Sequence, residues 1–165
     1  MNSSKQNHTD LTEANLNHAV ISSSKMKGVN LSGAYMRGAI IKETDLRGSN
    51  LCNVNMKQTV IINTDLSNAD LRYAEFSVSK FYKSDFSGSN LEGADLQNIE
   101  MHETDLGGAI FRNADLRHAE LKGTNLKDAD LSHADFEGAV LNSAVLSKAF
   151  FKRTKLKNTA RVGAV

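Results

Sequence analysis

The side chains that could carry out chemistry are few and scattered along this chain of 165 residues. Cys52 is the only cysteine, and we expect an inert surface thiol there rather than a redox centre. No glycine-rich phosphate loop, zinc-binding spacing or catalytic triad pattern is present. A metal site built from the histidines is the less favoured alternative to solvated side chains, because they are so dispersed: His8, His18, His102, His118 and His133.

These side chains must be positioned by a backbone that repeats every five residues. A large apolar residue, which we call the centre, recurs from Leu11 to Leu156 without insertion or deletion, giving 30 units over residues 9–158. The centres are 17 Leu, 6 Phe, 4 Met and 3 Ile. The residue two before each centre, which we call the small position, is nearly always Ala, Thr or Ser. Such regularity indicates a repeat architecture.

A period of five predicts a coil rather than a straight element. Centres five residues apart would alternate between the faces of a strand, and would advance by about 140° around an α-helix. One core can hold all of them only if the chain turns once per unit, with centres and small residues inside. Gly, Asn, Asp and Ser crowd the position two after the centre, where they favour a corner. Ile99, at a small position, should widen or shift one corner.

The unit of Ala, Thr or Ser, then Asp or Asn, then Leu or Phe, then any residue, then Gly or a polar residue resembles that of the pentapeptide-repeat proteins. The resemblance covers about nine-tenths of the chain. It implies an all-β fold, a right-handed quadrilateral parallel β-helix with four units per coil. The recurrence of Val20, Ile40 and Val60 independently favours 20 residues per coil. Thirty units then make about 7.5 coils.

The sequence predicts one domain with short flanking segments. Residues 1–8 are polar and contain no signal peptide or membrane span, residues 9–158 form the β-helix, and residues 159–165 form a short basic C-terminal tail. We therefore expect a cytoplasmic protein without membrane contact.

Charge is distributed unevenly although the whole chain carries only +1. Residues 91–137 hold 4 basic residues against 11 acidic ones, and residues 138–165 hold six basic residues and no acidic one. Two interpretations are open. The acidic side chains could bond backbone groups at the turns while the basic ones keep an exposed end soluble, or the two segments could form a surface for a partner.

A core filled by centres and small residues leaves no cavity for catalysis, so we expect neither an enzyme nor a cofactor. The favoured function is a non-catalytic protein-binding or structural scaffold whose protein partner the sequence does not identify. The alternative follows from the resemblance: some family members mimic duplex DNA, bind type II topoisomerases such as gyrase, and give resistance to quinolones or other gyrase poisons. This chain is not strongly acidic and lacks the loop insertions expected of the quinolone-resistance members. Direct nucleic-acid binding is not expected.

Two surfaces are candidates for contacts. Apolar residues next to centres should stack on one outer side, either as ordinary lateral packing or as a partner surface. Apolar residues of the last coils should mediate a homodimer through the C-terminal end, as the resemblance also implies. The partner-surface candidates are Val20, Ile40, Val60, Ile62 and Tyr82, and the dimer-end candidates are Leu146, Phe150, Phe151 and Leu156.

Overall fold

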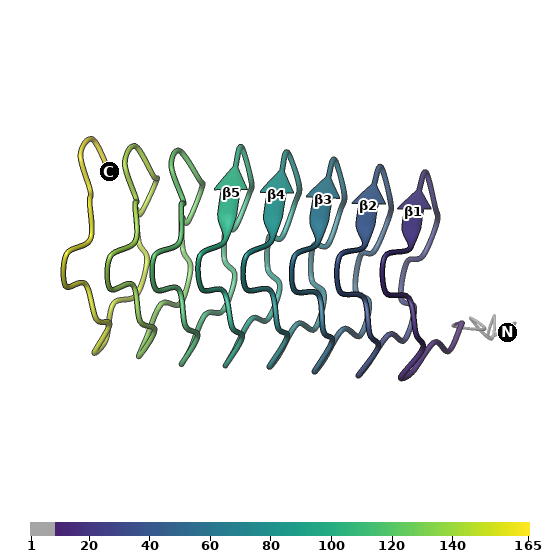
Figure 1. Cartoon of the computed structure of the whole chain (residues 1–165). Coiled ribbons are helices and arrows are strands. Elements are labelled where there is room, and N and C mark those ends of the chain that lie inside the picture. Colours follow the sequence, from purple (N-terminus) through teal and green to yellow (C-terminus); the bar gives the residue numbers. More distant parts are fainter. Residues whose placement is uncertain (1–8) are drawn as a thin grey trace, which may run out of the picture.

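The chain forms a rod of stacked coils, as seen in the computed structural model, which describes residues 9–165 (Figure 1). The polar segment expected at residues 1–8 lies outside the described residues. Within the described part the fold is a parallel β-solenoid without a helix. One short strand per coil builds a five-stranded sheet, in the order β1 (Val20–Ser22), β2 (Ile40–Lys42), β3 (Val60–Ile62), β4 (Lys80–Tyr82) and β5 (Glu100–His102).

Each coil is 20 residues long, because strands pair in parallel with a register of 20, as in Val20 with Ile40. The five strands span four coil-to-coil steps, so the regular sheet does not match the expected 7.5 coils. Before and after the sheet, isolated bridges keep the same spacing, from Asp10 with Asn30 to Val140 with Ala160. Residues 159–165, expected as a tail, therefore continue the pairing, which needs only backbone groups.

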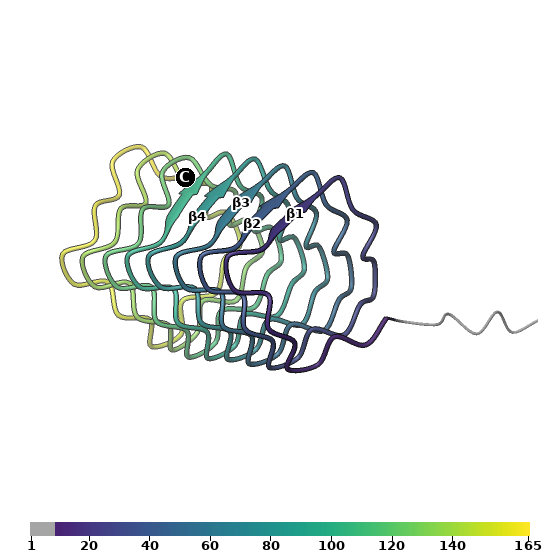
Figure 2. The same ribbon diagram turned by 45° about the vertical axis from the view of Figure 1, so that its right-hand side comes forward.

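Four columns of paired residues give the rod four sides (Figure 2). We name one side by its strands and the other three by a residue that lies on them. The strand side contains β1–β5. The other columns define, in chain order, the Asp65 side (Lys25, Asp45, Asp65, Asp85, Asp105), the Phe150 side (Asn90, Ile110, Asp130, Phe150) and the Arg117 side, whose column includes Asp95, Asp115 and Asp135.

The core lies inside the coils and contains the centres and the small positions. Every centre from Leu31 to Leu141 is at most 1% exposed. Three phenylalanines fill the middle of the rod: the rings of Phe76 and Phe81 meet edge to face at 5.2 Å, and those of Phe81 and Phe86 stack at 4.9 Å. Such packing leaves no interior space for a ligand.

The corners have a left-handed backbone at the position two after the centre. Gly93 has φ +68°, and non-glycine residues such as Tyr73, at +57°, adopt the same conformation. At most corners the next small residue donates its N–H to the centre carbonyl, as in Ala34 to Leu31 at 3.0 Å, which makes a type II turn. In the described chain no such bond is found between Ile99 and Leu96 or between Thr59 and Met56, and the Thr59 N–H bonds Ser79 Oγ instead. The wider or shifted corner expected at Ile99 stays a prediction.

The corners after β1–β5 are held by a side chain instead. Thr44 Oγ1 donates to the carbonyl of Lys42, two residues earlier, at 2.8 Å. This bond takes the place of the hydrogen bond of the type II turn and leaves the three residues before the corner extended. The strands β1–β5 therefore occur on this side. The same bond is made at each of these corners, by Ser24, Thr44, Thr64, Ser84 and Thr104.

Corner side chains also contact the glycine of the following coil. Two ring carbons of Tyr73 lie 2.6 Å from the position that a Cβ on Gly93 would occupy. His18 covers Gly38 and His118 covers Gly138 in the same way. A bulky corner residue is thus accommodated because the residue 20 positions later has no side chain.

Candidate binding surfaces

The possible sites lie on the outer surface, because the core is filled. Across residues 9–165, no group of three or more His, Cys, Asp or Glu side chains is arranged to hold a metal ion. His18 and His118 lie against corner glycines, and His102 stacks on Tyr82 with ring centroids 5.6 Å apart. His8 lies outside the described residues. Cys52 is partly exposed and unpaired.

The first candidate surface is a continuous strip on the strand side. Val20, Ile40 and Val60 are successive partners in the sheet, and Ile62 pairs with Tyr82 one column away. Val20 is 68% exposed, whereas the other four are partly covered by their neighbours. The structure therefore brings all five predicted residues together.

A polar cluster ends this strip at β4 and β5. Lys80 Nζ lies 2.9 Å from a carboxylate oxygen of Glu100, and the Tyr82 hydroxyl lies 3.5 Å from the same carboxylate. The hydrogen bond to Glu100 raises the pKa of Lys80 above its ordinary value, with the charge of Glu100 acting in the same direction. The strip is thus apolar toward β1 and charged toward β5.

The four residues of the second candidate surface are not all brought into one patch, because only Phe150 and Phe151 line a common pocket. Leu146, Phe151 and Leu156 are centres of the last coils; Leu146 and Leu156 pack partly against the core, whereas Phe151 is exposed, at 37%. Phe150 precedes a centre, so its ring points outward on the Phe150 side and is 62% exposed. The side chain therefore faces sideways, although Phe150 belongs to the last coil of its column.

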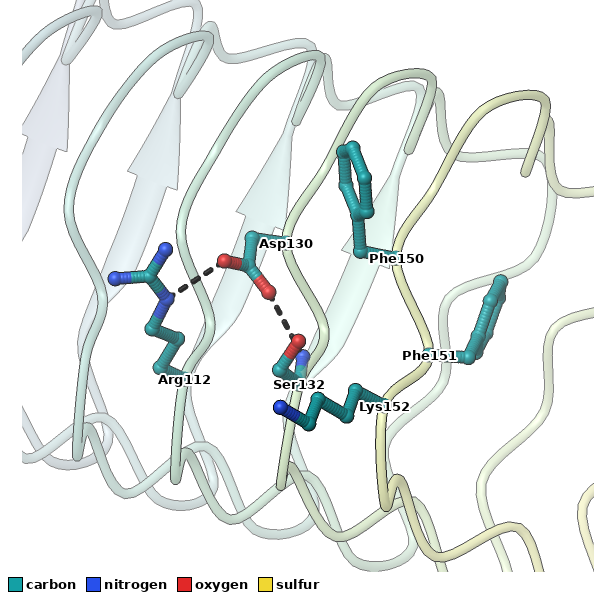
Figure 3. A pocket seen from close by; sticks show the side chains of 6 residues that line it. All are labelled: Arg112, Asp130, Ser132, Phe150, Phe151 and Lys152. Atoms are coloured by element: carbon teal, nitrogen blue, oxygen red, sulfur yellow. Dashed lines mark hydrogen bonds and ion pairs between the residues drawn. The ribbon is translucent and has the colours of Figure 1, made fainter.

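A shallow pocket of about 350 Å³ lies next to Phe150 (Figure 3). Arg112 Nε bonds Asp130 Oδ2 at 2.6 Å, and the Ser132 backbone N–H bonds Asp130 Oδ1 at 3.0 Å. Burial raises the pKa of Asp130, but the hydrogen bonds from Ser132 and Arg112 outweigh it and bring the pKa below its ordinary value. The lining residues are Arg112, Asp130, Ser132, Phe150, Phe151 and Lys152.

Four of the pocket residues, Arg112, Asp130, Ser132 and Lys152, were missed by the sequence reasoning. The signal that could have found them is the 20-residue register, which stacks Arg112, Ser132 and Lys152 in one column and Asp130 beneath Phe150.

The unit that builds these sides matches the sequence profile of pentapeptide repeats in eight copies, over residues 7–38, 30–68, 61–98, 96–132 and 119–158. The chain belongs to the pentapeptide-repeat family. Among curated proteins, no match was found.

Three solved pentapeptide-repeat structures illustrate the likeness. Rfr23 from the cyanobacterium Cyanothece 51142 is 38% identical over 55% of this chain and 63% of that chain, with a TM-score of 0.54. This chain thus matches less than two thirds of the length of Rfr23. A protein from Nostoc PCC 7120 is 27% identical over 65% of this chain and 84% of that chain, with a TM-score of 0.50.

The third structure is a trypsin-treated variant of QnrB1, a plasmid-mediated fluoroquinolone resistance protein. It is 18% identical over 95% of this chain and 88% of that chain, with a TM-score of 0.59. At this identity the likeness concerns the fold alone.

In this pentapeptide-repeat chain, ion pairs link neighbouring coils. Lys155 lies 2.9 Å from Asp135, and Lys157 lies 3.1 Å from Glu137, so two of the six bases in residues 138–165 reach acids of the preceding coil. The remaining four are exposed and form no ion pair with another residue of the described chain: Lys148, Lys152, Arg153 and Arg161. None of residues 9–165 forms a helix long and apolar enough to cross a bilayer.

Proposed function

We propose that this chain is a non-catalytic binding module that presents rigid sides of its β-helix to a protein partner. The observation that carries the proposal is the division of the repeat unit: centres and small residues fill the interior, while the other positions stand in straight outward columns. A surface of this kind can bind, but it lacks the enclosed cavity in which catalytic groups converge.

Rigidity supports this proposal. Backbone hydrogen bonds join each coil to the next. On the Phe150 side Leu51 N–H bonds the Asp70 carbonyl at 2.7 Å, and on the Asp65 side Leu46 N–H bonds the Asp65 carbonyl at 2.7 Å. Similar bonds occur on the strand side, from Ile40 N–H to the Ala19 carbonyl at 2.9 Å, and on the Arg117 side, from Met36 N–H to the Asn55 carbonyl at 2.7 Å. The sides are therefore ordered before a partner arrives. A partner then loses less free energy to ordering the interface than it would on a flexible loop.

The strip of Val20, Ile40, Val60, Ile62 and Tyr82 is the first surface to test. The double variant Ile40→Lys with Ile62→Lys should abolish partner capture from a lysate of the native cells, followed by mass spectrometry, while melting stays nearly unchanged. A matched control, Ser77→Lys with Gln97→Lys, also adds two lysines, in adjacent coils of the Arg117 side. Retained capture by the first double variant would exclude the strip.

The alternative function is regulation of a type II topoisomerase by DNA mimicry. In its favour, Asp45, Asp65, Asp85 and Asp105 are successive bridge partners, which places a row of carboxylates along the Asp65 side. Against it, 19 acidic residues face 20 basic ones in the whole chain. A gyrase supercoiling assay decides between the two functions: no effect of the protein, with or without a quinolone, removes the alternative.

A homodimer through the C-terminal coils remains a prediction. Sedimentation equilibrium on the intact protein and on Phe151→Asp tests it, because a buried carboxylate at this centre would oppose an end-to-end contact. A wild-type monomer at tens of micromolar would refute the dimer and leave the binding module intact.

A further inference from the structure

The pocket on the Phe150 side combines an exposed aromatic ring with two cations. Phe150 is 62% exposed, and no acidic residue follows residue 137 in the chain. Arg112 and Lys152 belong to the same outward column with Ser132 between them (Figure 3). Two coil steps separate their backbones by about 10 Å.

Both cations have unused binding capacity. Arg112 bonds Asp130 through Nε, and its two terminal nitrogens make no hydrogen bond to another residue in the described part of the chain. Its side chain is 55% exposed. Lys152 is exposed and forms no ion pair with the other described residues. An anion between them would be bound by charge-assisted hydrogen bonds, and a planar guanidinium particularly suits a carboxylate.

The size and charge of the pocket favour a short acidic segment of a protein over a long polyanion such as a nucleic acid. The cationic region is narrow, because residues 91–137, which supply Arg112 and the coils next to the pocket, hold 11 acidic residues against 4 basic ones. A nucleic acid would extend over these acids and be repelled. The pocket itself contains one of these acids, Asp130, which is paired with Arg112, so that Arg112, Asp130 and Lys152 together leave a single positive charge for one carboxylate. An adjacent apolar side chain can cover the Phe150 ring.

We propose that this pocket binds a short acidic segment of a protein partner in which an apolar side chain stands next to a carboxylate. The apolar side chain packs on Phe150, and the carboxylate is held between Arg112 and Lys152. The inference rests on the proposed binding function and names a second surface for it, separate from the strip on the strand side.

The test is a fluorescence anisotropy titration with a labelled seven-residue peptide, Gly-Ser-Glu-Phe-Glu-Ser-Gly, blocked at both ends. Wild-type protein should bind it saturably at low salt. Phe150→Ser and Lys152→Glu should each weaken binding by roughly tenfold or more, as expected for central contacts. Peptides with Gln in place of both Glu, or Ala in place of Phe, should bind the wild type as weakly.

Two variants serve as matched controls. Tyr35→Ser removes another exposed aromatic residue that precedes a centre, with the ring 52% exposed, on the Arg117 side. Lys27→Glu reverses an exposed cation that follows a centre, as Lys152 does, on the Asp65 side. Both should bind the peptide like the wild type.

Several results would overturn the inference. These are absence of saturable peptide binding, equal binding of the Gln peptide, undiminished binding by Phe150→Ser or Lys152→Glu, and tighter binding of a single-stranded oligonucleotide through the same residues. Dissociation of a wild-type dimer by Phe150→Ser would make a second copy the occupant instead. The titration needs no native partner, so its failure differs from a failure of the proposed function, in which no surface variant on any side alters partner capture.

Discussion

The middle and outer coils are built from the same five-residue unit, yet the same residue type has a different environment in each. In the middle, Leu96 is fully buried between coils on both sides. Centres of the outer coils, including Leu11, Leu16, Leu146 and Leu156, are only partly buried. Burial of a centre thus comes from both neighbouring coils. The contribution of a centre to the free energy of unfolding therefore depends on the coils stacked on either side of it.

The largest expected effect separates a middle centre from an outer one. Leu96→Asp places a charge in the filled core and should cost about 4 kcal/mol or more, enough to threaten the fold. Leu156→Asp leaves its carboxylate near water and should cost about 1–2 kcal/mol. Chemical denaturation of both variants measures the difference. Equal shifts in midpoint would show that burial by neighbouring coils does not set the stability.

A smaller effect is expected at the corners. In Gly48→Ala the added Cβ has no other atom within 4 Å. The variant should therefore lose only about 1 kcal/mol of stability, from the strain of an alanine in the left-handed conformation. Gly93→Ala also displaces the Tyr73 ring and should cost about 1 kcal/mol more. Thermal melts of the two variants give the comparison. Adding Tyr73→Ala should lower the cost of Gly93→Ala to that of Gly48→Ala, and an unchanged cost would rule out the ring contact.

Two buried serines at small positions should respond with opposite signs. Ser79 Oγ donates to the Met56 carbonyl at 2.7 Å and accepts the Thr59 N–H at 3.0 Å, so Ser79→Ala should destabilise by about 1–2 kcal/mol. The Ser89 hydroxyl is buried without a partner in the described chain, so Ser89→Ala should be neutral or stabilise by up to about 1 kcal/mol. Urea midpoints distinguish the two. A loss of stability in Ser89→Ala would indicate a bound water at its hydroxyl.

The smallest effect is expected on the outside. Lys57 lies 3.1 Å from Glu75 in the next coil, but both side chains are more than a third exposed. Lys57→Ala should therefore change stability by less than about 0.5 kcal/mol. Melting at two salt concentrations measures it, and a change as large as that of Gly93→Ala would contradict the assignment of this column to solvent.

Much of the fold could be predicted from the sequence, because a large apolar residue and a small residue recur every five positions and one core can hold both only if the chain turns once per unit. The assignment of Leu66 and Leu96 to the core and the corner at Gly93 follow from that period. The four-unit coil was implied by the resemblance to the pentapeptide-repeat proteins and supported by the recurrence of Val20, Ile40 and Val60. The hydroxyls of Thr44 and Thr64 were expected to point inward, but their bonds to strand-side carbonyls depend on corner geometry that the period does not specify.

The candidate sites were less predictable. The strip from Val20 to Tyr82 was found because its apolar residues recur every 20 residues in two columns of the same side. Phe150 was grouped with Phe151 because both belong to the last coils, although Phe151 is a centre and Phe150 precedes one, so that Phe150 faces outward. The cations near Phe150 come from different coils, so only the 20-residue register, and no local pattern, brings Arg112 and Lys152 together with it.

The register of 20 has a mechanical consequence. Hydrogen bonds between coils run along the rod, so a force applied at its C-terminal end would load only the bonds of the outermost coil. That coil would detach and lengthen the chain by about 70 Å of extended backbone, while the coils behind it kept their structure. Under tension the molecule would therefore unfold one coil at a time, in steps of equal length, rather than in a single event that unfolds the whole domain.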